Sequence, residues 1–194
     1  MFLGLVKDHK FIPTIYKETV FDVDYIKLYE SGIRLILTDL DNTLVSYKDD
    51  VVSEKLLEFI NERKNEGFEV MIISNNSSEK RVKEFAEKLD IKYISKAMKP
   101  LKGGFKKILK KASRKYNPDE IVAIGDQLMT DVFAANRMNY TSILVKAIDR
   151  KTETWTTRFN RALEKYVLKR IMKKHQKLYE EKLKFYNEEN YGRD

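Results

Sequence analysis

Short apolar runs recur along the middle of this chain, and each of them ends in small or acidic polar residues. Runs of this kind, bounded by turn-forming residues, are typical of strands buried in a parallel sheet. The pattern predicts strands at residues 35–37, 68–76, 91–95, 120–126 and 141–145.

Between these runs, apolar residues recur at the three- and four-residue intervals of an amphipathic helix. The spacing predicts helices over residues 52–67, 78–89 and 101–116, one that ends at Met138, and a long one over 156–186. Strands that alternate with helices in this way indicate a parallel sheet covered on both faces. The predicted fold is therefore α/β, a three-layer α/β/α Rossmann-like architecture with about five parallel strands.

The 194 residues fit one domain with a substantial core and an appendage at either end. The apolar residues of 1–32 lack a sustained period, so we expect this segment to form an N-terminal arm. We expect its apolar side to pack on the core. Residues 33–150 form the predicted sheet domain. Residues 151–194 form a basic amphipathic C-terminal helix and tail.

The composition excludes several classes of protein. There is no cysteine, so disulfides, thiolate metal sites and cysteine nucleophiles are excluded. Lys7, Asp8 and Lys10 interrupt the apolar start before a signal-peptide core could form. No uncharged apolar run approaches the roughly 18 residues of a membrane span. We therefore expect a cytoplasmic protein.

The net charge of +8 is placed unevenly along the chain. Residues 150–186 hold 12 Lys and Arg against 4 Asp and Glu, which accounts for the whole excess. A basic helix of this kind fits an anionic partner, and it could bring the protein to the inner membrane face. Its apolar stripe leaves packing on its own domain, on a partner chain or on a membrane open. We expect Trp155 and Phe159 to dock its beginning on the sheet domain.

Polar side chains follow the predicted strands at the points where they end. They are Asp39 with Asp41, Ser74 with Asn75, Lys99, and Asp126 with Asp131. Each alone could be a turn former, a helix cap or a surface residue. In a parallel sheet, however, all of them meet at one edge, which is where ligands bind. Clustered carboxylates without thiolates favour Mg²⁺, and a lysine and a hydroxyl beside the metal favour a phosphate ligand.

Two carboxylates two residues apart at the end of a strand can divide the work of phosphoryl transfer. One attacks phosphorus to give an aspartyl phosphate, and the other protonates the leaving oxygen and then deprotonates water. Asp39 and Asp41 have this spacing.

The motifs DLDNTLV at 39–45, SNN at 74–76, AMKP at 97–100 and IGDQLMTDV at 124–132 resemble, in order, the four motifs of the haloacid dehalogenase (HAD) superfamily. Together with TRFNR at 157–161, they resemble the YqeG family of subclass IIIA phosphatases. That family is similar to mitochondrial phosphatidylglycerophosphate phosphatases. The resemblance implies a HAD fold and a phosphomonoester hydrolase that depends on Mg²⁺.

The resemblance also implies a role for each matching residue. Asp39 would be the nucleophile and would bind Mg²⁺ through its other oxygen. Asp41 would be the general acid and base and would give the metal its backbone carbonyl. Asp126 would ligate Mg²⁺ directly.

The remaining motif positions are expected to hold the phosphate or to support the site. The residues expected at the substrate phosphate are Asn42, Thr43, Ser74, Asn75 and Lys99. Gly125 and Asp131 are expected to support the metal shell or Lys99.

The spacing between motifs leaves no room for a cap domain, because Asp41 and Ser74 lie 33 positions apart and Ser74 and Lys99 lie 25 apart. A capless site suits a phosphate that projects from something large, and the leading hypothesis is a phospholipid headgroup, most plausibly that of phosphatidylglycerophosphate. A nucleotide, sugar phosphate or phosphoprotein is a second hypothesis. A third is a binding protein whose basic tail grips RNA, although the chain lacks stacking-rich RNA motifs.

Overall fold

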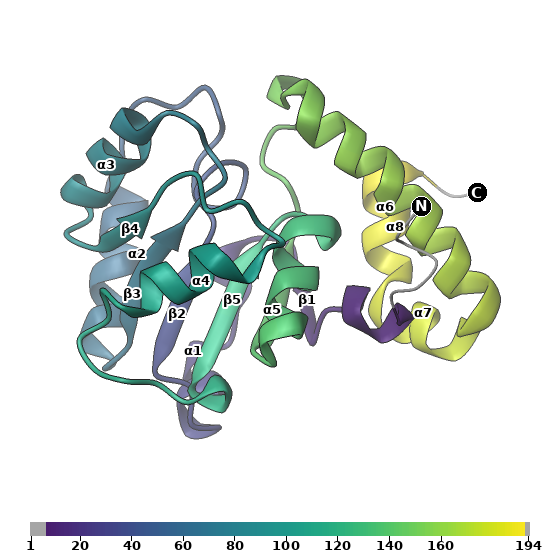
Figure 1. Ribbon diagram of the computed structural model, residues 1–194, viewed down its shortest axis with the longest axis horizontal. Helices are drawn as coiled ribbons and strands as arrows, with labels where there is room; N and C mark the ends of the chain where they lie inside the picture. Colours follow the sequence, from purple (N-terminus) through teal and green to yellow (C-terminus); the bar gives the residue numbers. More distant parts are fainter. Residues whose placement is uncertain (1–6, 193–194) are drawn as a thin grey trace.

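The computed structural model describes residues 7–192, and its centre is a single sheet of six parallel strands (Figure 1). The strand order is β1-β6-β5-β2-β3-β4. The strands are β1 Ile15–Lys17, β2 Leu35–Thr38, β3 Glu69–Ile73, β4 Lys92–Ile94, β5 Ile121–Gly125 and β6 Thr141–Val145. The five predicted strands are confirmed, and β2 lies near the middle of the sheet, between β5 and β3.

The sixth strand, β1, comes from the segment that the sequence predicted to be an irregular arm. It adds a parallel edge to the sheet, with Ile15 opposite Ile143. Phe11, just before it, is fully buried. The arm thus packs on the core and also extends the sheet. Three residues are too few to show a period, so the hydropathy pattern carries no strand signal here. Residues 1–6 of the arm lie outside the described residues.

Helices cover both faces of the sheet, because alternate residues of each strand point to opposite sides. On one face lie α1 Tyr25–Glu30, α2 Glu54–Asn65 and α3 Glu79–Lys88, packed against a cluster that includes Ile36 and Ile72. On the other face lie α4 Lys102–Leu109 and α5 Phe133–Met138, packed against Leu35 and Leu37. This is the predicted three-layer arrangement.

Helix α4 is shorter than the predicted helix over 101–116. It ends at Leu109, and the following residues turn away. The backbone N–H of Ser113 donates to the Glu69 carboxylate at 2.9 Å, and its hydroxyl donates to the same carboxylate at 2.7 Å. These bonds replace the bonds that the helix would have made, so a polar contact from a distant strand ends the helix.

The predicted long helix over 156–186 is wrong as a single element. The chain instead forms three helices that fold back on one another, α6 Trp155–Lys174, α7 Gln176–Lys182 and α8 Lys184–Tyr191 (Figure 1). The breaks fall at His175 and Leu183, neither of which has helical backbone angles. Folding back lets the apolar residues of all three helices form one cluster with the sheet domain. Its members include Phe11, Leu144, Val167, Leu168, Ile171, Tyr179, Leu183 and Tyr186.

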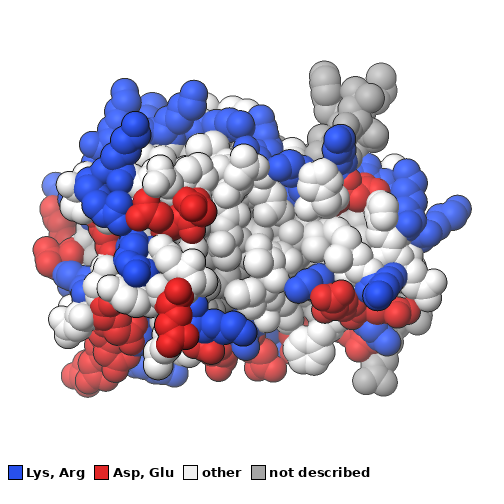
Figure 2. All heavy atoms as spheres, turned by 90° about the horizontal axis from the view of Figure 1, so that it is seen from below, with Lys and Arg blue, Asp and Glu red and all other residues white. Residues whose placement is uncertain are grey.

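The C-terminal helices therefore pack on their own domain. Of the three possibilities for the apolar stripe, namely its own domain, a partner chain or a membrane, the structure shows the first. None of the helices in residues 7–192 combines the length and the apolarity needed to cross a bilayer. Figure 2, seen from below the view of Figure 1, shows Lys and Arg along the upper border, mostly on the left, where Figure 1 places the sheet. Basic side chains thus also gather on the half of the molecule that holds the sheet.

We predict that Ile171→Ala lowers the free energy of unfolding by about 2–5 kcal/mol, because it empties a fully buried position between the C-terminal helices and the sheet domain. Its neighbour Met172 is 38% exposed, so Met172→Ala should stay within about 0.5 kcal/mol. Urea unfolding measures both. Equal stability of the two variants would mean that the C-terminal helices are not docked in solution.

Candidate functional site

Three neighbouring strands bring the first candidate residues to one edge of the sheet. Asp39 follows β2, Ser74 follows β3 and Asp126 follows β5, and the register of these strands places their carboxyl ends side by side. The Asp39 N–H donates to the carbonyl of Ile124 at 2.9 Å, which extends the ladder one step past the strand. The backbone that carries Asp39 is therefore fixed by the sheet itself.

Lys99 reaches this edge from the segment after β4, and its ammonium group lies between two carboxylates. Nζ is 2.9 Å from Asp39 Oδ1 and 2.6 Å from Asp131 Oδ1. Asn75 fixes the lysine backbone, since its side chain donates to the Lys99 carbonyl at 3.0 Å and accepts from the Lys99 N–H at 2.7 Å. Burial opposes the charge on Lys99, but the Asp131 and Asp39 carboxylates raise its pKa above the usual value, so it stays protonated.

Three carboxylates come together here. One oxygen from each of Asp39, Asp126 and Asp131 lies within 4.8 Å of the other two, and all three residues are buried. Both oxygens of Asp131 have partners, since Oδ2 accepts from the backbone N–H of Gln127 at 3.1 Å. Asp126 Oδ1 is buried and has no hydrogen-bond partner. A buried carboxylate oxygen left unpaired among like charges is a place for a cation.

Gly125 is required by this packing. A Cβ built on Gly125 would lie 2.2 Å from Cγ of Asp131, which no side chain can tolerate. The glycine therefore lets Asp131 pass close to the end of β5 and reach Lys99.

Helix α6 adds further contacts to the site, which the polar residues at the strand ends do not predict. Arg161 is 4% exposed, pairs with the Asp126 carboxylate and donates from Nη1 to the Asp126 carbonyl at 2.8 Å. It also pairs with Glu153 at 2.9 Å and with Glu164 at 3.3 Å. Tyr186 of α8 donates its hydroxyl to Glu164. The only sequence signal for Arg161 was its position in the TRFNR motif.

All buried charged residues in the part of the chain that the structure describes belong to this one group. We call it the charge cluster, and its members are Asp39, Lys99, Asp126, Asp131, Glu153, Arg161 and Glu164. Five carboxylates face two cations, so the cluster is short of positive charge. Burial raises the pKa of Asp39 to about 8 and that of Asp126 to about 7. The neighbouring carboxylates act in the same direction, and Lys99 and Arg161 act in the opposite one.

Asp41 lies apart from the charge cluster. Asn76 donates to one of its oxygens at 2.8 Å, and Arg81 donates from Nε to the other at 2.9 Å. Arg81 also binds the carbonyls of Asp49 at 2.7 Å and Ser46 at 3.0 Å. It thus ties helix α3 to the loop after β2 and holds the Asp41 side chain in place. Arg81 stands outside the motifs, so the sequence did not single it out.

The other residues expected at the phosphate are buried around the same edge. Asn42 has a left-handed backbone with φ of 62°, and it accepts backbone N–H groups of the segment after β6 on both its carbonyl and its side chain. The hydroxyl of Thr43 is buried and has no hydrogen-bond partner. Ser74 is 1% exposed, and its Oγ accepts from the N–H of Asn76 at 3.0 Å.

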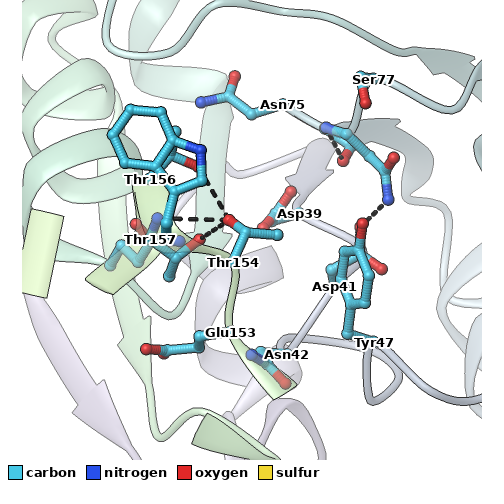
Figure 3. Close-up of a pocket in the computed structure, with 14 residues that line it drawn as sticks. Asp39, Asp41, Asn42, Tyr47, Asn75, Ser77, Glu153, Thr154, Thr156 and Thr157 are labelled. Atoms are coloured by element: carbon cyan, nitrogen blue, oxygen red, sulfur yellow. Dashed lines mark hydrogen bonds between the residues drawn. The ribbon is translucent and has the colours of Figure 1, made fainter. Parts of the chain in front are cut away.

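A pocket of about 500 Å³ opens above these strand ends (Figure 3). Its lining includes Asp39, Asp41, Asn42, Ser74 and Asn75, together with residues 153–157 at the start of α6. In Figure 3, Asp41 and Tyr47 lie on the side of the pocket opposite Thr156 and Thr157. Of the three clustered carboxylates, Asp39 is the one that lines the pocket.

The expectation that Trp155 and Phe159 dock helix α6 on the sheet domain is wrong. Trp155 is 78% exposed and Phe159 is 58% exposed. The helix is held instead by Arg161 and by the apolar residues one turn further on, so its first turn stands free at the mouth of the pocket.

The donor set fits a metal ion. Three buried carboxylates supply hard oxygen ligands, one of their oxygens has no partner, and the charge cluster lacks positive charge. Asp39 and Asp126 are the members best suited to hold the ion, because each is engaged by a cation through one oxygen, whereas both oxygens of Asp131 are engaged.

Comparison with known proteins gives a family and two related chains. Residues 2–148 match the family model described as mitochondrial PGP phosphatase. The "Probable phosphatase YqeG" of Bacillus subtilis is 38% identical over 164 residues, which cover 84% of this chain and 93% of that protein. The "Phosphatidylglycerophosphate phosphatase 1, chloroplastic/mitochondrial" of Arabidopsis thaliana is 24% identical over 179 residues. The aligned part is 88% of this chain and 51% of the plant protein, so the chain spans about half of the plant protein's length.

Among solved structures, the cobalt-bound deoxy-D-mannose-octulosonate 8-phosphate phosphatase of Haemophilus influenzae is similar to this chain, with a TM-score of 0.44 and 13% identity. The superposition covers 74% of this chain and 90% of that one. The family match ends at residue 148, so Arg161 lies beyond it.

We predict that Arg161→Met lowers the free energy of unfolding by about 3–5 kcal/mol, because it leaves the buried carboxylates of Asp126 and Glu164 without their counter-charge and Glu153 with only its longer pair to Arg150 at 3.8 Å. Methionine keeps most of the volume, so the loss reports on charge. Arg158 on the same helix is exposed, and Arg158→Met should stay within about 0.5 kcal/mol. Chemical denaturation measures both variants. A loss below about 1 kcal/mol for Arg161→Met would contradict the pairing.

Proposed function

The chain belongs to the mitochondrial PGP phosphatase family and is a HAD-like phosphomonoesterase, and from this premise we propose that it removes the terminal phosphate of phosphatidylglycerophosphate in a Mg²⁺-dependent reaction. The observation that carries the proposal is the position of Asp39. It belongs to the buried acidic triad and also lines the open pocket.

Asp39 is the nucleophile in this proposal. One of its oxygens attacks the phosphorus of the bound monoester, the bond from phosphorus to the leaving oxygen breaks, and an aspartyl phosphate forms. Lys99, fixed 2.9 Å from Asp39, neutralises the charge of the transferring group. The Ser74 hydroxyl already accepts a backbone N–H, which leaves its own proton free to donate to a phosphoryl oxygen.

Asp41 is the general acid and base. It donates a proton to the leaving glycerol oxygen and later takes a proton from the water that hydrolyses the aspartyl phosphate. Arg81 and Asn76 hold its carboxylate at the wall of the pocket, so both steps start from a fixed position. In the same loop, Asn42 lines the pocket and Thr43 has a buried hydroxyl without a hydrogen-bond partner, and both are proposed to contact the phosphate.

Asp39, Asp126 and the Asp41 backbone carbonyl would hold the Mg²⁺. When bound, the ion supplies positive charge that polarises the phosphoryl group. Asp131 takes no part as a ligand and holds Lys99 in place. Arg161 fixes the orientation of Asp126, because it engages the carboxylate and the carbonyl of the same residue.

The pocket supports a lipid substrate. No domain is inserted between residues 41 and 99 to close over it, since this stretch holds only α2, β3, α3, β4 and their loops. An open pocket can take a phosphate that projects from a bilayer. The Arabidopsis relative is named for the same substrate.

We predict that the purified protein releases phosphate from phosphatidylglycerophosphate in mixed micelles and that Asp39→Asn lowers kcat by roughly a thousandfold or more, because an amide cannot act as the nucleophile. Asp50→Asn, an exposed change in the same loop, should stay within about twofold. Phosphate release is measured for this lipid and for a panel of soluble phosphate esters. Turnover of soluble esters alone would exclude the lipid substrate, and near-normal activity of Asp39→Asn would exclude the covalent route.

We also predict that Mg²⁺ raises the melting temperature more above about pH 8 than below about pH 6. In the unfolded chain, Asp carboxyls ionise near about pH 3.9. The folded Asp39 and Asp126 keep their protons to about pH 8 and 7, so the metal-free protein loses stability as the pH rises through this window. Mg²⁺ binds the ionised carboxylates and restores that stability.

Differential scanning calorimetry with and without Mg²⁺ measures this effect. Asp126→Asn should remove most of the Mg²⁺-dependent gain, whereas Asp50→Asn should keep it. An equal gain at both pH values would place the metal elsewhere.

A further inference from the structure

Several large apolar side chains are exposed near the pocket. Among residues 7–192, 13 large hydrophobic side chains are exposed, and 7 of them stand in the segments that follow β2, β4 and β6, as far as the first turn of α6. Six of these form what we call the apolar rim, namely Tyr47, Met98, Leu101, Ile148, Trp155 and Phe159, and the seventh is Val51, further along the loop after β2. They come from the segments after β2, β4 and β6, which meet at one edge because the sheet is parallel.

The apolar rim borders the catalytic pocket. Tyr47 and Trp155 line it directly. Met98 precedes Lys99, whose backbone carbonyl accepts a hydrogen bond from the side chain of the pocket residue Asn75. The Ile148 N–H donates to the carbonyl of the pocket residue Asn42 at 3.1 Å. Exposed apolar side chains gathered at the entrance of a site mark a surface that meets another apolar phase or partner.

Basic side chains are interleaved with the apolar rim. Lys48, Lys96, Lys102, Lys151 and Arg158 stand in the same segments, are exposed, and form no ion pair with a carboxylate of the described residues. The acidic residues of these segments are fewer. Asp50 lies 3.4 Å from Arg81, and Asp49 and Asp149 accept backbone N–H groups at 2.8 and 2.9 Å. The five unpaired basic side chains outnumber these carboxylates, so the net charge around the rim is positive.

From this juxtaposition we propose that the apolar rim and its basic residues dock the open edge of the sheet on an anionic lipid bilayer. The inference rests on the proposed lipid substrate and names the surface that brings the pocket to it. Trp and other apolar side chains enter the interface between headgroups and acyl chains, and Lys and Arg bind the anionic headgroups. A protein groove would not need unpaired cations distributed around every apolar side chain of the entrance.

Docking through the rim replaces docking through the C-terminal helix. Val167, Leu168 and Ile171 of α6 are buried on the helix's own domain. Its most exposed apolar residues, Trp155 and Phe159, stand at its first turn and belong to the rim. The rim, by contrast, holds the pocket against the bilayer, where a phosphate on a lipid headgroup lies at the depth of the entrance.

Trp155 is the single tryptophan of the chain and reports docking directly. Its fluorescence is recorded with vesicles of phosphatidylcholine and phosphatidylglycerol, in the presence of a chelator so that no turnover occurs. We expect a blue shift and quenching by brominated acyl chains, and a weaker response with phosphatidylcholine alone. No shift with anionic vesicles would overturn the proposal. A shift that grows with protein concentration without vesicles would also overturn it, in favour of self-association.

Matched variants separate the rim from the rest of the surface. Vesicle affinity should fall about tenfold or more for the double variant Phe159→Ala with Leu101→Ala, because two side chains lose their apolar contact. Phe185 of α8 is 56% exposed, close to the exposure of Phe159, so Phe185→Ala should leave the affinity within about twofold. An equal loss in rim and control variants would overturn the proposal.

A second pair tests the charges. Lys102→Ala with Arg158→Ala should weaken vesicle binding about tenfold, because each basic residue near an anionic surface contributes to binding. Lys173→Ala with Lys174→Ala removes the same charge from the last turn of α6 and should have a smaller effect. The reverse order would assign docking to the C-terminal helix instead.

Activity on soluble esters, detergent micelles and vesicles distinguishes the docking surface from the proposed reaction. Phe159→Ala with Leu101→Ala should hydrolyse soluble esters at the normal rate and lose activity only on vesicles. If the protein hydrolyses the lipid in detergent micelles but does not bind vesicles, the docking surface is wrong and the reaction stands. If it binds vesicles through the rim but hydrolyses no lipid phosphate, the substrate is wrong and the docking surface stands.

Discussion

The site depends on one electrostatic constraint, which is that five carboxylates are buried together with only two cations. Isolated charges are costly to bury, so each member must lie where another compensates it. Lys99 compensates Asp39 and Asp131, and Arg161 compensates Asp126, Glu153 and Glu164. At the acidic triad, the Oδ1 atom of Asp126 is left without a hydrogen-bond partner. The chain thus builds a place for a metal ion by leaving its own charges unbalanced.

This constraint joins the C-terminal helices to the sheet domain. Helix α6 carries the guanidinium that compensates Asp126, and α8 supplies the hydroxyl that binds Glu164. The apolar cluster with Phe11 and Ile171 holds these helices at the distance that the ion pairs need. The segment after residue 150 is therefore part of the site, and its basic composition does not by itself make it a binding tail.

The site residues that follow strands could be predicted from the sequence. The features that depend on tertiary contacts could not. Asp39, Ser74, Lys99 and Asp126 could be placed together because each follows a recognisable strand and parallel strands share an edge. Strand β1 is too short to show a period, and the breaks in the C-terminal helix carry neither proline nor glycine. Arg161 and Arg81 were two basic residues among many, and only tertiary contacts distinguish them from the solvent-exposed ones.

The exposure of Trp155 shows why a hydropathy pattern alone mistakes an exposed aromatic residue for a core residue. An aromatic residue at the start of a helix is expected to pack inward, and here the inward positions near it are taken by Arg161 and Glu164, which the charge cluster requires. With polar side chains occupying the buried face, the aromatic side chains of the first turn are left on the outside, next to the pocket. The same arrangement that balances the buried carboxylates thus places apolar side chains at the entrance, and the chemistry and the surface around it have one physical origin.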